Sequence, residues 1–218
     1  MSLRFALIKI SQASILLPVI VGLQNYKKLN IQFKILFFFF ASTIGFEIQA
    51  SILKMVYHNN MPGLHLFTLL EFLVFSSVYY LNFPKNTLLK LLIVINGIVF
   101  IVIAFTDALL INTIWNPNTL SRSYSSISII TYTLIYFYYL FSNDLEYYSW
   151  QYPMFWISIS ALIYFGINMF YFMLNRYLIS KAANTAILSL YTHAVINCIS
   201  NLLYAQSFRC FRKQKALL

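Results

Sequence analysis

Apolar residues fill long runs along the chain, and short polar clusters separate these runs. A run of about 20 apolar residues is long enough for an α-helix to cross the hydrocarbon core of a bilayer. Runs of this length cover residues 5–25, 35–57, 62–83, 87–109, 123–142, 153–175 and 186–208. The pattern therefore predicts an all-α fold, a polytopic membrane helix bundle with seven transmembrane helices, in which residues 1–218 form a single transmembrane domain.

The first of these segments is the weakest. Its apolar run is interrupted by Lys9, Ser11, Gln12 and Ser14. A basic start followed by an apolar stretch also resembles a signal peptide, but no small-residue cleavage site precedes Gln24. We therefore interpret the segment as a retained helix, with a cleaved signal as the alternative.

Composition supports solvation by lipid. The chain is 61% apolar and only 9% charged, with a mean hydropathy of +0.74. Soluble domains contain roughly 25% charged residues. A water-soluble fold of 218 residues could not hide this much apolar surface, so lipid must cover part of it.

The net charge of +10 bears on topology more than on nucleic acid. The basic residues lie between apolar runs and in a short tail at residues 209–218, and they form no stripe typical of a nucleic-acid-binding face. Lys and Arg in short loops favour the cytoplasmic side. With the N-terminus outside, nine basic residues lie inside and six outside, Arg122 among the latter. We predict a multi-pass protein of a bacterial inner membrane, with the C-terminus cytoplasmic and no nucleic-acid partner.

Ionisable residues within the apolar segments are the candidate functional groups. Such residues are costly in hydrocarbon, and they normally face the interior of a bundle or a water-filled cavity. Glu47 lies in the middle of the second segment and Glu71 in the middle of the third, where His65 and Thr68 precede it at intervals of three residues. The fourth segment ends near Asp107, which we expect to be solvated.

The last two segments carry rows of polar residues at helical spacing. The rows are Ser160, Tyr164, Asn168, Tyr171 and Asn175, and Ser189, His193, Asn197, Ser200 and Tyr204. Such rows are expected to face other helices, since unpaired polar groups are unfavourable in lipid. One interpretation is hydrogen bonding between helices alone.

The other interpretation is a polar crypt inside the bundle, with the two carboxylates at its floor. Its candidate ligand-binding or proton-handling residues are Glu47, Glu71, His193, Asn197, His65, Thr68 and Asn168. Their depth predicts a crypt in the membrane half that holds the loops after the second and sixth segments. In the predicted orientation, that half is the outer leaflet.

The crypt favours binding or sensing of an unknown small ligand. The carboxylates could bind a cationic or hydroxylated group or carry protons, and the histidine could titrate near neutral pH. Because no signalling domain is found in the sequence, a signal would pass to a separate protein or through self-association. The alternatives are a transporter or a membrane-embedded hydrolase acting on lipid, with Glu and His as acid and base.

No catalytic or metal-binding motif supports the enzyme alternative, so catalytic residues stay unassigned and no cofactor is expected. A zinc ion held by His65, His193 and a Glu is the one cofactor that the residue types would allow.

Two local stretches carry a resemblance to known proteins. Residues His65–Phe72 and Thr192–Asn197 are similar to stretches in the membrane input modules of bacterial sensor kinases. The seven short-looped segments and the basic tail resemble small bacterial seven-helix membrane proteins of unassigned role. The resemblance implies a receptor-like role.

Overall fold

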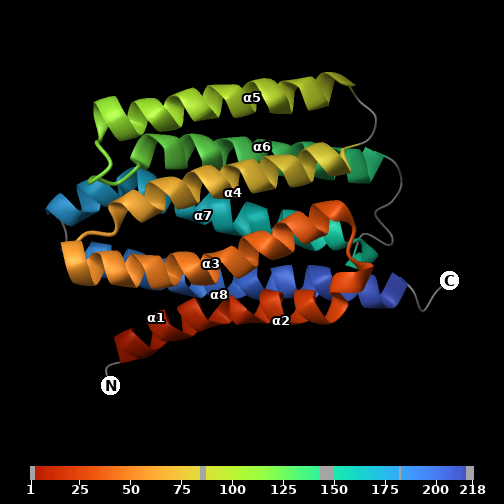
Figure 1. The fold of residues 1–218 in the computed structure, drawn as a ribbon, viewed down its shortest axis with the longest axis horizontal. Coiled ribbons are helices and arrows are strands. Elements are labelled where there is room, and N and C mark those ends of the chain that lie inside the picture. Colours follow the sequence, from red (N-terminus) through yellow and green to blue (C-terminus); the bar gives the residue numbers. More distant parts are fainter. Residues whose placement is uncertain (1–2, 84–86, 143–149, 182, 215–218) are drawn as a thin grey trace.

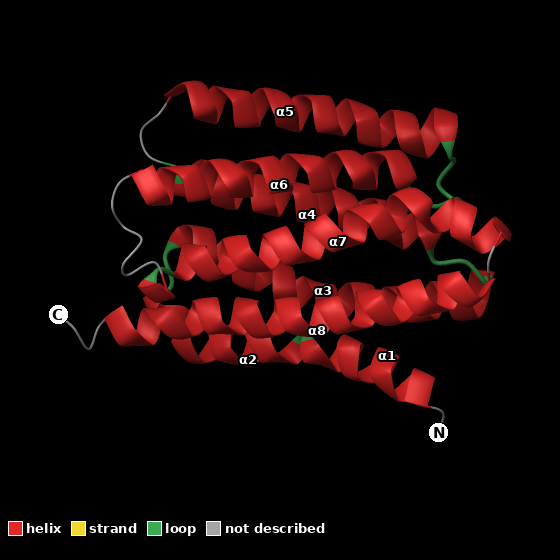
Figure 2. Ribbon diagram, turned by 180° about the vertical axis from the view of Figure 1, so that it is seen from behind, coloured by secondary structure: helices red, strands yellow, loops and turns green. Residues whose placement is uncertain are grey.

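The computed structural model describes residues 3–83, 87–142, 150–181 and 183–214. Within these ranges the chain forms helices that lie side by side, and the two termini lie at opposite ends of the bundle (Figures 1 and 2). The helices are α1 Leu3–Ser14, α2 Leu16–Asn25, α3 Ile31–Tyr57, α4 Met61–Asn82, α5 Thr87–Thr106, α6 Thr119–Ser142, α7 Pro153–Lys181 and α8 Ala183–Gln214. The predicted all-α bundle is confirmed.

The first predicted segment is one rod with a break. Helices α1 and α2 meet at Ile15, and both pack along α8. Pro18 explains the break, since proline lacks an N–H group and its ring clashes with the carbonyl group four residues earlier, here that of Ser14. Counting α1 and α2 together, the described helices form seven rods, as predicted.

The other helices match their predicted segments except near their ends. Helix α5 continues into a π-helical turn, Asp107–Ile111. Helix α6 begins at Thr119, one turn earlier than predicted. Helix α8 extends to Gln214, so most of the predicted basic tail is helical, and only residues 215–218 lie outside the described part.

Five rods are long and apolar enough to cross a membrane. They are Ala6–Lys28, Ile31–Tyr57, Met61–Asn82, Thr87–Ile111 and Pro153–Phe170. This composition makes the chain a membrane protein. Helices α6 and α8 fall outside this group because they carry many polar residues, several of which are buried against other helices, including Ser125 and Thr133 of α6 and Ser200 and Asn201 of α8. The most polar rods therefore face the interior.

Helix α4 supplies much of the core. Its Phe72 ring stacks on Phe100 of α5 with ring centres 3.9 Å apart, and its Phe75 meets the edge of Phe165 of α7 at 5.3 Å. The hydroxyl of Tyr79 lies 2.6 Å from Oγ1 of Thr133 on α6. Helix α5 lies at one edge of the bundle in Figure 1, and Phe100 is one of its two buried residues.

We predict that Phe100→Ala lowers the free energy of unfolding by about 3 kcal/mol, since it leaves a cavity against Phe72. Phe105→Ala on the same helix removes a ring that is 58% exposed, and it should cost less than about 1 kcal/mol. Unfolding of the purified protein in sodium dodecyl sulfate, followed by circular dichroism, measures both values. Equal losses would contradict the packing of α5 on α4.

Candidate functional site

A buried ion pair lies at the centre of the site. Nη1 of Arg122 is 2.7 Å from Oε2 of Glu71, and the two side chains are 6% and 3% exposed. Nη1 also donates to Oγ1 of Thr68 at 3.2 Å, and Nη2 donates to the hydroxyl of Tyr164 at 3.1 Å. Buried charges are tolerated only when they are paired and hydrogen-bonded. The Arg122 guanidinium therefore ties α6 to both α4 and α7.

Arg122 was missed as a site residue by the sequence analysis, which counted it among the basic residues of the outer side. The predicted helix began at residue 123, whereas α6 begins at Thr119 and carries Arg122 into the bundle. The signal available in the sequence was the helical spacing of Arg122, Ser126 and Thr133, which places them on one side of a helix. All three are buried in the structure. A buried Glu71 also requires a cation or a proton.

A cavity of about 430 Å³ opens beside the ion pair. It lies near the end of the bundle where α3 joins α4 and α7 joins α8. Its polar lining consists of Gln12, Thr43, Glu47, Asn60, Thr68, Asn118, Arg122, Tyr164, His193 and Asn197. We call this cavity the polar crypt.

The structure brings most of the predicted site residues to the crypt. Four of them line it directly, namely Glu47, Thr68, His193 and Asn197. Glu71 lies behind Arg122, and Asn168 contacts His193. Two asparagines also contact α1, since Asn197 Nδ2 donates to Oγ of Ser11 at 3.0 Å and Asn201 donates to Ser14. The side chains of Tyr171, Asn175 and Ser189 lie outside the described part of the chain.

The two carboxylates occupy different positions, so the expectation of a floor made by both is wrong. Glu71 is buried in its ion pair, whereas Glu47 is exposed on the crypt wall. Oε2 of Glu47 accepts a hydrogen bond from Nε2 of Gln12 at 2.9 Å. Within the described residues, Glu47 has no cationic side chain at ion-pair distance. The carboxylate of Glu47 is therefore accessible from the crypt.

His193 has a defined orientation. Its Nδ1 lies 2.8 Å from Oδ1 of Asn168, which is 1% exposed. A carboxamide oxygen can only accept, so Nδ1 carries a proton and the Nε2 of the neutral ring is a hydrogen-bond acceptor. Tyr164 and His193 both line the crypt, with ring centres 6.3 Å apart, and so add donors and acceptors to its wall.

The structure places His65 outside the crypt. Its Nε2 donates to the backbone oxygen of Asn116 at 3.0 Å, and it does not line the cavity. On α4, His65 faces the loop that precedes α6, whereas Thr68 faces inward and accepts a hydrogen bond from Asn118 at 2.7 Å. No group of three His, Cys, Asp or Glu residues that could hold a metal ion occurs in the described ranges.

Asp107 is not solvated, contrary to expectation. It is fully buried and accepts hydrogen bonds from the backbone N and the Oγ of Ser121, both at 2.8 Å, and from Asn112 at 2.5 Å. A carboxylate that accepts from a backbone N–H in the first turn of a helix caps that helix and interacts favourably with its dipole. Asp107 thereby fixes the start of α6 and positions the adjacent Arg122.

Fold and site together define a helical membrane bundle with a polar crypt beside a buried ion pair. Comparison of the chain with protein-family models, with curated proteins and with solved structures finds no match. The function must therefore be argued from the site itself.

We predict that Glu71→Gln and Arg122→Gln each lower the free energy of unfolding by about 3–5 kcal/mol, because each leaves one buried charge unpaired. The double variant should lose less than the sum of the two single variants, since it removes both charges. Unfolding in sodium dodecyl sulfate measures the complete cycle.

Glu47→Gln is the matched control, because it makes the same chemical change at an exposed carboxylate. It should cost less than about 1 kcal/mol. Strictly additive losses in the cycle would show that Glu71 and Arg122 do not interact.

Proposed function

We propose that the protein is a membrane-embedded, receptor-like binding protein for a small polar ligand that enters the polar crypt. The observation that carries this proposal is the exposed Glu47 carboxylate, which lines the same crypt as an Arg122 that is already neutralised by Glu71. A crypt of about 430 Å³ also falls within the range of about 300–1,000 Å³ that small-molecule sites occupy.

The charges indicate the class of ligand. Arg122 and Glu71 cancel each other, so Glu47 contributes the uncompensated charge of the lining. A ligand with an ammonium group would pair with Glu47. Its hydroxyl or carbonyl groups would meet the polar side chains of Tyr164, Asn197 and His193. An anionic ligand would meet the unpaired carboxylate, and we expect it to be excluded.

The hydrogen bond between Gln12 and Glu47 suggests how binding would be transmitted. It joins α1 to α3, and α1 otherwise packs mainly on α8. A cation bound at Glu47 competes with Gln12 for the same oxygen atoms. A ligand shifts a conformational equilibrium by its difference in affinity for the two states. Binding would therefore move α1 relative to α3, and a separate signalling protein or a second copy of the chain would sense this movement.

The proposed location is a bacterial inner membrane with the N-terminus outside, and the basic residues of the loops support this orientation. The crypt would then open toward the outer leaflet, because it lies at the end of the bundle that holds the N-terminus (Figure 1). An extracellular or periplasmic solute would reach it directly.

Thermal unfolding with small ammonium compounds tests the proposal. The purified protein is titrated with ethanolamine and with tetramethylammonium, and glycerol serves as a neutral hydroxylated probe. We expect a saturable rise of the melting temperature with at least one ammonium probe, since only the folded state binds it. This rise should disappear in Glu47→Gln.

Glu146→Gln is the control, since it removes a carboxylate from the sequence between α6 and α7. It should respond to the ammonium probes as the natural protein does. Absence of a response in the natural protein, or an equal response in Glu47→Gln, would overturn the proposal.

A further inference from the structure

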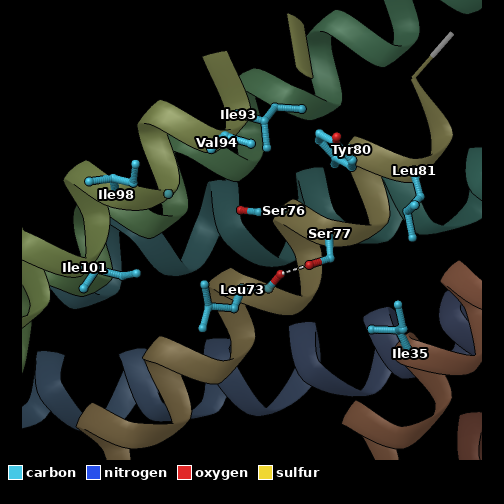
Figure 3. Close-up of a pocket in the computed structure, with 11 residues that line it drawn as sticks. Ile35, Leu73, Ser76, Ser77, Tyr80, Leu81, Ile93, Val94, Ile98 and Ile101 are labelled. Atoms are coloured by element: carbon cyan, nitrogen blue, oxygen red, sulfur yellow. Dashed lines mark hydrogen bonds between the residues drawn. The ribbon is translucent and has the colours of Figure 1, made fainter. Parts of the chain in front are cut away.

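A second cavity lies on the outer surface of the bundle, and neither Glu71 nor Arg122 lines it. It is a groove of about 470 Å³ between α4 and α5, with Ile35 of α3 at one edge. Figure 3 shows isoleucines of α5, such as Ile98 and Ile101, facing the groove from one side and Leu73 of α4 from the other. Its lining is mostly aliphatic, so it suits a hydrocarbon chain.

The hydroxyl group of Ser77 is hydrogen-bonded within α4, so it presents no unpaired donor to the groove. It donates to the backbone oxygen of Leu73 at 2.7 Å, as the dashed line in Figure 3 marks. Gly97 of α5 also lines the groove, and a Cβ atom placed there would meet nothing within 4 Å. The groove is therefore open at Gly97, where a larger side chain would fill it.

The groove continues into a second hollow that carries a positive charge. Tyr80 and Val94 line both, and the second hollow adds Thr87 and Lys90 at the start of α5. The ammonium group of Lys90 lies 5.2 Å from the centre of the Tyr80 ring. In the part of the chain that the structure describes, no carboxylate forms an ion pair with Lys90. An apolar groove thus ends at a cation.

Dimensions and depth fit a lipid. The eleven residue steps from Lys90 to Ile101 span about 16 Å of helix, close to the roughly 15 Å of hydrocarbon in one leaflet. The start of α5, near Lys90, lies at the same end of the bundle as the end of α2, which Lys27 and Lys28 follow in the sequence (Figure 1). Basic residues of this kind attract anionic headgroups. The positive charge of Lys90 and the aliphatic wall are therefore complementary to one molecule that has an anionic headgroup and an acyl chain.

We propose that the groove between α4 and α5 is a binding site for one anionic phospholipid of the surrounding bilayer. The acyl chain lies against Gly97, Ile98 and Leu73, and the phosphate group pairs with Lys90 next to the Thr87 hydroxyl. This site is separate from the polar crypt and does not depend on the ligand proposed for it.

Native mass spectrometry of the full chain tests the proposal. The protein is purified from nanodiscs that contain equal amounts of phosphatidylglycerol and phosphatidylcholine, and the lipids that stay bound are counted. We expect one retained phosphatidylglycerol per chain. Lys90→Gln should lower the preference for phosphatidylglycerol about fivefold, since it removes one interfacial cation.

Gly97→Leu should abolish retention of the lipid, because a Cβ atom at this position meets nothing within 4 Å and the rest of the side chain would occupy the groove. Gly45→Leu is the matched control on α3, where a Cβ atom also meets nothing within 4 Å, and it should retain the lipid. Equal retention of both lipids by the natural protein would overturn the headgroup assignment. Unchanged retention in Gly97→Leu would overturn the position of the site.

Discussion

The buried ion pair between Glu71 and Arg122 is the constraint on which the arrangement of the central helices depends. Either charge alone would cost several kcal/mol in a low-dielectric interior, so the two must stay in contact. Thr68 and Tyr164 take up further N–H groups of Arg122. Since Arg122 lies on α6 and its partners lie on α4 and α7, the pair sets the rotation of three helices at once. Apolar contacts alone would leave such rotations less well defined, because aliphatic side chains pack in many ways.

The same constraint explains the chemistry of the crypt. An arginine that is already neutralised presents little net charge to the cavity, which leaves Glu47 as the uncompensated group. The pair is held from outside the crypt as well, because Asp107 fixes the first turn of α6 through Ser121. A residue that looks like a helix-end carboxylate in the sequence therefore determines where the arginine of the site lies.

The length of the apolar runs predicted most of the fold, because lipid imposes a fixed length on each apolar rod. Helical spacing likewise identified Asn168, His193 and Asn197, which face other helices as expected. Arg122 was missed as a site residue because the start of α6 depends on the contact between Asp107 and Ser121, which no local sequence pattern reveals. His65 was misplaced because spacing states which residues share a face, but not which way that face turns. The exposure of Glu47 likewise depends on how α1 approaches α3, and this is settled by tertiary packing.

Helix α4 connects the two proposed sites. Thr68 and Glu71 face the crypt and its ion pair, while Leu73, Ser77 and Tyr80 face the groove on another side of the same helix. Phe72, the residue after Glu71, stacks on Phe100 of α5. This contact holds α5, the other wall of the groove, against α4. Any rotation of α4 would alter both cavities together, and coupling between two sites is reciprocal. Because the ion pair resists that rotation, a lipid in the groove and a ligand in the crypt would influence each other only as far as the pair allows.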